Sequence, residues 1–282
     1  MNRKVKSILG KTIAHIIIIF FGVLMLYPIL WLIASSFKSG NTIFSNPSIF
    51  SNAYTLQNYV SGWKGIAGTP FITFILNSIF ICACVIVCNL VSCSMAAYAF
   101  SRLNFVFKGV WFAIMMITLM LPGQVKTIPQ YVMFNTFHWV NTYLPLIIPH
   151  LFATDAFFVF LLMQFMRGLP QDLDESATID GCGRGGIFLR IIIPLSGPAL
   201  VTTALFSFLW NWDDFFNQLL YLNNVKTYTI PLGLRMFMDS AGASSWGSLF
   251  AMSVVALIPC FILFFALQKY FVQGIATTGL KG

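Results

Sequence analysis

The sequence predicts an all-α integral membrane protein that crosses the bilayer about six times. Of its 282 residues, 58% are hydrophobic and only 9% are charged, whereas a soluble domain carries roughly a quarter charged residues. The apolar residues also form long uncharged runs, most of which reach the ~20 residues that a helix needs to cross a bilayer. Lipid cannot satisfy free backbone groups, and the sequence lacks the alternating pattern of a membrane barrel, so helices are expected.

Six spans are expected along the chain, near residues 13–36, 71–100, 109–128, 144–167, 195–222 and 247–268. A cleaved signal peptide is the alternative for the first span, because a basic segment precedes it. Its apolar run continues through Tyr27, Pro28 and Trp31, beyond the roughly 7–15 residues of a signal core. The sequence therefore predicts that this helix is retained.

Lysine and arginine predict the orientation of the spans. If the amino terminus lies in the cytoplasm, most of the 16 lysines and arginines fall in cytoplasmic segments, as the positive-inside rule requires. Six crossings return the carboxyl terminus to the cytoplasm as well. The prediction is a multi-pass protein of the bacterial inner or cytoplasmic membrane, in contact with lipid. No basic stripe with interleaved aromatic residues is present in the sequence, so no nucleic-acid partner is expected.

The sequence holds no catalytic or metal-binding pattern. Four of the six cysteines lie in the second expected span, where cysteine behaves as a small apolar residue, and no histidine or acidic residue accompanies them. The three histidines share no helical face or spacing. Gly10-Lys11-Thr12 matches the end of a phosphate-binding loop, but Val5 stands where its first glycine belongs. An enzyme, a metal site and a nucleotide site in this chain are therefore not expected.

The segment richest in signals is the longest loop expected on the cytoplasmic side, residues 168–194. Leu169-Pro170 suits the start of a helix, since proline at the first position loses no hydrogen bond. Acidic residues crowd the first turns, where the helix dipole favours negative charge. Leu173, Ala177 and Ile179 form a short apolar stripe. A short helix with one apolar side is therefore expected in the first half of the loop.

A turn at Asp180-Gly181 separates this helix from a second one, because these residues favour turn conformations. Ile187, Phe188 and Ile191 lie on one side of the second short helix, which leads to Pro194. A solvated connection between spans is the simpler interpretation of a charged loop. Two helices with small residues at their bend favour a docking element instead.

The stretch Glu175-Ser176-Ala177-Thr178-Ile179-Asp180-Gly181, followed by Ile187-Phe188 and Ile193-Pro194-Leu195, resembles the EAA loop of ABC-importer permeases. Ser176 and Cys182 stand where alanine is usual, and both are small. Further matches lie along nearly the whole chain, at 77–78, 96–102, 121–125, 164–165, 169–170, 231–234, 268–274 and 279–282. In this order and spacing they resemble the MalG-like branch of the maltose-type carbohydrate permeases.

The resemblance implies the type I ABC importer permease fold. Residues 1–70 are then the cytoplasmic amino terminus, the first transmembrane helix and an outer loop. Residues 71–282 form the permease core of five transmembrane helices, with the EAA loop at 168–194 and a cytoplasmic tail at 269–282.

The resemblance also implies a membrane-spanning permease subunit of an ATP-driven importer for sugars, with oligosaccharides as the expected solutes. Its implied partners are a second, different permease subunit, an ATPase dimer that binds ATP and magnesium, and an extracellular or periplasmic sugar-binding protein. The chain itself then needs no cofactor. An ABC permease for a non-sugar solute and a passive channel remain alternatives, although a channel has no reason to keep the EAA pattern.

The resemblance assigns two contacts with the ATPase. The coupling residues of the EAA loop are Glu175, Ala177, Asp180, Gly181, Ile187 and Phe188. In the tail, Gly279, Lys281 and Gly282 are expected at the ATPase interface, and a frayed terminus is the alternative.

A candidate solute pathway lies in the fifth expected span. Charges inside a membrane are expensive, so acidic residues there should face water or a partner. At helical spacing one face of this span carries aromatic rings and hydrogen-bonding side chains, a combination that suits a sugar: Trp210, Asp213, Asp214, Asn217 and Tyr221. A gate or a contact with the second permease are the alternatives. Asp155, near the outer end of the fourth span, is a weaker candidate, and an interfacial cap or a charge pair is the alternative for it.

Overall fold

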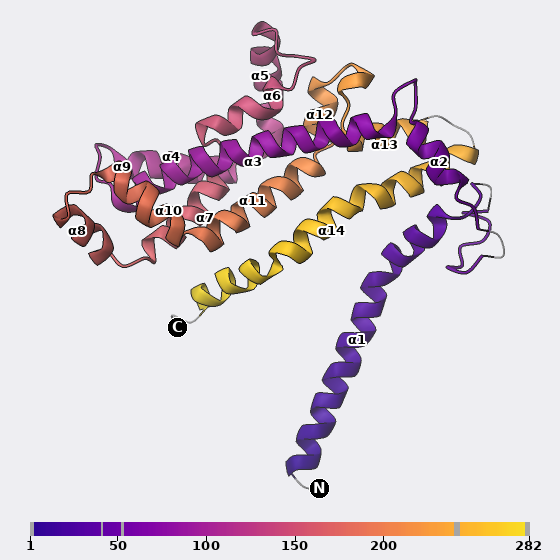
Figure 1. Cartoon of the computed structure of the whole chain (residues 1–282), viewed down its shortest axis with the longest axis horizontal. Helices are drawn as coiled ribbons and strands as arrows, with labels where there is room; N and C mark the ends of the chain where they lie inside the picture. The colour runs from indigo at the N-terminus through magenta and orange to yellow at the C-terminus, as the bar shows by residue number, and fades with distance from the viewer. Residues whose placement is uncertain (1–2, 41, 52–53, 240–242, 280–282) are drawn as a thin grey trace. The chain divides into compact units, whose positions relative to one another are not determined.

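The computed structural model describes residues 3–40, 42–51, 54–239 and 243–279, and it confirms the expected all-α membrane architecture (Figure 1). Within the described residues, four helical segments are long and apolar enough to cross a membrane. They are Gly10–Ser36, Phe71–Arg102, Leu144–Arg167 and Trp246–Gln268. Two further pairs of helices, each sharply bent, bring the number of spans to as many as six.

The chain divides into two compact units. The first unit comprises Met1–Phe71 and Leu234–Leu257, and the second comprises Ile72–Gly233 and Ile258–Gly282. Two helices, α13 (Ile230–Asp239) and α14 (Ala243–Gly279), contribute residues to both units.

In the first unit, a loop packs between α1 (Arg3–Ser36) and α2 (Gln57–Lys64) around a buried lysine. The Lys38 ammonium donates to the carbonyl oxygen of Asn46 at 3.0 Å and to that of Ser48. The buried Asn58 amide of α2 donates to the carbonyls of Ser36 and Lys38, at 2.8 and 2.6 Å. These bonds fold the loop back onto the end of α1.

The second unit begins with α3 (Phe71–Arg102) and continues through a series of shorter helices. In order, these are α4 (Lys108–Met120), α5 (Gly123–Thr136), α6 (Leu144–Ile147), η1 (Ile148–Phe152), α7 (Ala156–Arg167), α8 (Asp172–Ile179), α9 (Arg184–Ile187), η2 (Phe188–Ile192), α10 (Ile193–Leu195), α11 (Gly197–Trp212), α12 (Phe216–Tyr221) and η3 (Val225–Thr227). Its largest core forms where α7 packs against the second half of α3, with Phe158, Leu162 and Met166 buried against Cys93 and Ala97.

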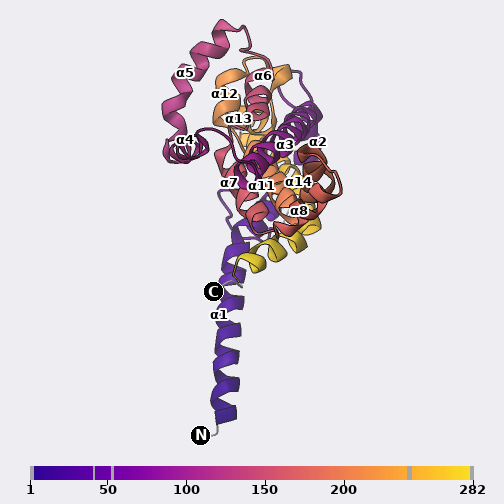
Figure 2. The same ribbon diagram turned by 90° about the vertical axis from the view of Figure 1, so that its left-hand side faces the viewer.

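The third expected span is not one straight helix. The sequence predicts a helix over 109–128, but α4 ends at Met120 and α5 begins at Gly123, and the two axes meet at 102° (Figure 2). Pro122 lies at the bend in an extended conformation, with φ −57° and ψ 134°. Proline has no N–H to donate, and its ring disfavours a helical residue before it. The helix therefore stops at this point.

The fifth expected span, 195–222, also differs from a single helix. The helical segment Arg184–Leu195 meets α11 at 76°, and α11 ends at Trp212. Asp213–Phe215 are not helical, and α12 follows. The Asp214 carboxylate, two residues before the start of α12, accepts a hydrogen bond from the Asn217 backbone N–H at 3.1 Å. The break between α11 and α12 is therefore stabilised by a hydrogen bond of its own.

Candidate functional site

Loop 168–194 forms the two short helices expected from the sequence, joined by the expected turn. Gly181 has φ +80° at this turn, a conformation that L residues with side chains rarely adopt. The first helix starts later than predicted, at Asp172 rather than at Leu169-Pro170. The carbonyl of Leu169 instead accepts a hydrogen bond from the Arg102 guanidinium at 2.8 Å.

The predicted coupling residues of this loop fall into two sets. Ala177 and Ile187 are buried in the core of the second unit, and Phe188 packs against that core. Glu175 and Asp180 are exposed. The predicted apolar stripe is wrong at Ile179, because the Ile179 side chain is 85% exposed. Two residues along a helix correspond to about 200° of rotation, so Ile179 lies away from the side on which Ala177 packs.

The carboxyl-terminal turns of α3 hold both halves of the loop. The Tyr98 hydroxyl donates to the carbonyl of Arg184 at 3.1 Å, and its ring lies 5.1 Å from that of Phe188. Arg102 Nε lies 3.3 Å from Asp174 Oδ2. The sequence pattern includes residues 96–102 in the resemblance but gives them no contact. The sequence signal that could have identified this contact is a single arginine, Arg102, at the end of a long apolar run.

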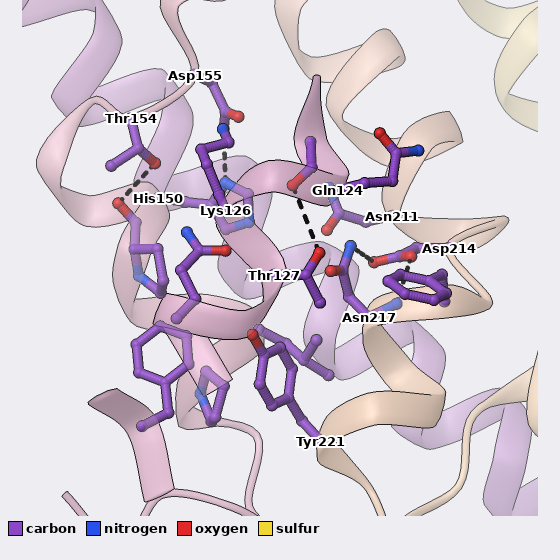
Figure 3. Close-up of a pocket in the computed structure, with 17 residues that line it drawn as sticks. Gln124, Lys126, Thr127, His150, Thr154, Asp155, Asn211, Asp214, Asn217 and Tyr221 are labelled. Carbon is purple, nitrogen blue, oxygen red and sulfur yellow. Dashed lines mark hydrogen bonds and ion pairs between the residues drawn. The ribbon is translucent and has the colours of Figure 1, made fainter. Parts of the chain in front are cut away.

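A second candidate site is a cavity of about 420 Å³ in the second unit, drawn in Figure 3. Helices α5, α6, η1 and α12 and the end of α11 surround it. It is lined by Gly123, Gln124, Lys126, Thr127, Gln130, Phe134, Pro145, Leu146, Pro149, His150, Thr154, Asp155, Asn211, Asp214, Phe216, Asn217 and Tyr221. Amides, hydroxyls, charged groups and aromatic rings thus meet in one cavity.

The two carboxylates of the cavity have different partners. Asp155 Oδ2 lies 2.5 Å from His150 Nδ1. Asp214 accepts hydrogen bonds from the Asn217 backbone N–H at 3.1 Å and from its side-chain amide at 3.0 Å.

Of the five residues predicted for the solute pathway, Asp214, Asn217 and Tyr221 line the cavity. Asp213 is exposed and does not line the cavity. Trp210 stacks on Phe158, with ring centroids 5.1 Å apart, and does not line the cavity. The prediction assumed one continuous helical face, and that face ends where α11 stops.

The residues that the sequence pattern missed come from other elements. Gln124, Lys126, Thr127 and Gln130 belong to α5, while His150 belongs to η1. Asp155, the weaker sequence candidate, also lines the cavity. Helical spacing within one span cannot find residues that separate elements bring together.

The predicted tail contact is only partly described. Gly279 is the last described residue of α14, and Lys281 and Gly282 lie outside the described residues. The role of the tail stays a prediction.

Comparison with known proteins gives matches over nearly the whole chain. Residues 88–277 match the model of the binding-protein-dependent transport system inner membrane component family. The chain is 33% identical to the trehalose/maltose transport system permease protein MalG of Thermococcus litoralis, over 98% of this chain and 99% of that protein. It is also 33% identical to the arabinooligosaccharides transport system permease protein AraQ of Halalkalibacterium halodurans, with both chains fully covered.

A solved structure matches the fold. A chain of a bacterial ABC transporter involved in the import of the acidic polysaccharide alginate superposes with a TM-score of 0.84. It is 21% identical, and the match covers 96% of this chain and 99% of that one. The importer-permease fold that the resemblance implies is therefore confirmed.

Proposed function

Because this chain belongs to the family of binding-protein-dependent transport system inner membrane components, we propose that it is the permease subunit of an ATP-driven importer whose solutes are sugars, oligosaccharides above all. The chain is a component of a transporter rather than an enzyme. The observation that carries the sugar assignment is the similarity, over nearly the full length, to permeases for trehalose and maltose and for arabinooligosaccharides.

The proposed partners are an ATPase dimer that binds ATP and magnesium, a second permease subunit and an external sugar-binding protein. The geometry of loop 168–194 supports a contact with the ATPase. Ala177, Ile187 and Phe188 anchor the loop to the core, which leaves Glu175 and Asp180 exposed for a basic partner. The distribution of lysine and arginine supports a cytoplasmic location for this loop and for both termini.

We place the cavity around Asp214 and Tyr221 on the solute pathway. Its volume of about 420 Å³ lies within the roughly 300–1,000 Å³ of sites that bind small molecules. Its amides and hydroxyls suit the hydroxyl groups of a sugar, and the exposed ring of Phe216 suits the apolar face of a sugar ring. Because Trp210 and Asp213 lie outside the lining, Asp214, Asn217 and Tyr221 are the residues of the fifth expected span that we assign to this site.

Purification of the tagged chain in mild detergent, followed by mass spectrometry, tests the proposal. An ATPase and a second, different permease are expected to copurify. Cells that lack this chain are expected to lose uptake of at least one of labelled maltose, trehalose and an arabinooligosaccharide. A chain that purifies alone, even after gentle crosslinking, favours a passive channel. An intact assembly that imports none of these sugars favours a non-sugar solute.

A further inference from the structure

We propose that the carboxyl-terminal turns of α3, residues 96–102, are the seat through which loop 168–194 acts on the solute pathway, with Arg102 and Tyr98 as positioning residues. The inference rests on the proposed function, because it assigns the route by which the ATPase-facing loop moves the pore. It also gives a role to a sequence segment that the resemblance includes without a function.

Arg102 joins three segments at the end of α3. Its side chain is 4% exposed. Nη2 donates to the carbonyls of Met166 at 2.9 Å and Leu169 at 2.8 Å, at the end of α7 and just after it. Nε lies 3.3 Å from Asp174 Oδ2 on α8, whose side chain is 22% exposed. The Arg102 guanidinium therefore links the end of α3 to the end of α7 by hydrogen bonds and to α8 by an ion pair.

The carboxylate of Asp174 depends on this contact. Among the described residues, its other oxygen, Oδ1, and Arg102 Nε are both buried without a hydrogen-bond partner, so Asp174 and Arg102 form an ion pair and no hydrogen bond. Removing one partner of a largely buried ion pair leaves the other charge uncompensated, so such pairs are costly to break. The position of α8 is therefore tied to the position of Arg102.

Tyr98 binds the second half of the loop independently. Its hydroxyl donates to the Arg184 carbonyl at the start of α9, and its ring contacts Phe188. Arg102 and Tyr98 lie four residues apart, on the same side of α3. A displacement of either half of the loop therefore acts on the same two turns of one helix.

The other half of α3 contacts the cavity region. Ile81 and Val85 of α3 belong to the apolar cluster that contains Phe134 and Tyr221, both of which line the cavity. The 32 residues of α3 span about 48 Å at ~1.5 Å per residue. A helix is rigid along its axis, so motion at the seat is transmitted to the cluster beside the cavity.

The amino-terminal end of α3 is bound as firmly as the seat. The Asn77 amide donates to the carbonyls of Lys226 and Tyr228, at 2.9 and 2.8 Å. The Ser78 hydroxyl accepts from the backbone N–H of Ile230 at 2.9 Å. Both ends of α3 are thus fixed to other segments of the second unit, which makes it a mechanical link between them.

The experiment compares Asp174→Asn with Asp172→Asn in the assembled importer. Both acids lie in the first turn of α8, so both variants lose the same charge near the helix dipole. Only Asp174 contacts Arg102, and Asp172 is exposed. Tyr98→Phe is the second variant, because it removes the hydroxyl bond to Arg184 and keeps the ring.

Two quantities are measured. Hydrogen exchange of the amides of α8 is expected to be about tenfold faster in Asp174→Asn than in Asp172→Asn. The amount of solute imported per ATP hydrolysed is expected to fall about threefold or more in Asp174→Asn and in Tyr98→Phe, and to stay unchanged in Asp172→Asn. A purely structural role lowers the yield of assembled importer and leaves the ratio in the remaining importer intact.

Equal exchange and equal import ratios in Asp174→Asn and Asp172→Asn overturn the inference while the proposed function stands. Import without ATP hydrolysis in the unaltered protein overturns the proposed function itself. The exchange measurement needs no solute. It therefore tests the contact between Arg102 and α8 separately from the import ratio and from the proposed function.

Discussion

At the scale of single residues, Asp214 has two roles. Its carboxylate accepts two hydrogen bonds from Asn217 of α12, and it also lines the cavity.

Asp214→Ala removes the acceptor of both hydrogen bonds from Asn217. The variant is therefore expected to unfold at a lower temperature than the unaltered protein, because each lost hydrogen bond costs about 0.5–1.5 kcal/mol.

Thermal unfolding of the purified protein in detergent measures this difference. Asp213→Ala is the matched control, because Asp213 is the preceding residue and is exposed. An Asp214→Ala variant that unfolds at the same temperature as Asp213→Ala contradicts the prediction.

Gly181 makes a second prediction at this scale. A Cβ added at this position meets no atom within 4 Å, but φ is +80°, so conformation rather than volume limits substitution. Asparagine tolerates left-handed φ values and valine does not. Gly181→Val is expected to cost about 1–3 kcal/mol locally and to abolish import, whereas Gly181→Asn retains import. Uptake assays at equal membrane abundance check this, and loss of import in both variants shows that side-chain volume is decisive.

At the scale of elements, the interruption between α11 and α12 is stabilised by a buried amide. Gln218 is 2% exposed. Its Nε2 donates to the Asn211 carbonyl at 3.0 Å, near the end of α11, and its oxygen accepts from the Thr229 hydroxyl. One side chain thus joins α11 and α12 to the segment that precedes α13.

Gln218→Leu is therefore expected to lower the free energy of unfolding by about 1–3 kcal/mol, the cost of leaving buried polar groups unpaired. The double variant Gln218→Leu with Thr229→Val removes the stranded hydroxyl as well, so it is expected to recover part of that loss. Chemical unfolding monitored by tryptophan fluorescence measures both. A double variant that is less stable than Gln218→Leu contradicts the proposed bond.

The spans could be predicted from the sequence more fully than the bends between helices. Long uncharged runs identify membrane-spanning helices, because an apolar composition is enough to place a helix in lipid. The interruption after Trp212 depends on Gln218 reaching the Asn211 carbonyl, which no run length reveals. Pro122-Gly123 did carry a local signal for the α4–α5 bend, but the uncharged run across it favoured one span.

The candidate site could also be predicted only in part from the sequence. The turn at Gly181 could be predicted because glycine and aspartate have strong local preferences. The cavity could not, because its lining comes from α5, η1 and α12 together. Ile179 shows a further limit, since an apolar residue at the end of a short helix packs or stays exposed according to its neighbours in space.

At the scale of the whole molecule, the distribution of lysine and arginine predicts the orientation in the membrane. If both termini lie in the cytoplasm, the segment around Asn224 faces outward and the start of α8 faces the cytoplasm. Asn224→Cys is expected to react with a membrane-impermeant maleimide in intact cells. Gln171→Cys is expected to react only after the membrane is permeabilised.

Both positions are exposed, so their reactivities are comparable once the reagent has access. The unaltered protein, with its six cysteines, provides the background labelling. Labelling of Gln171→Cys in intact cells, with Asn224→Cys protected, reverses the orientation.

The bonds at the amino-terminal end of α3 also set an order of events during synthesis. Asn77 and its partner Lys226 are 149 residues apart in the chain. At about 5–20 residues per second, the ribosome needs roughly 7–30 s to make the second partner after the first. During that interval α3 has already been synthesised, but Asn77 and Ser78 lack the carbonyls and the N–H that bind them in the finished protein. A chain whose synthesis stops before Lys226 lacks these bonds, so the amino-terminal end of α3 is held by fewer contacts in it than in the finished protein.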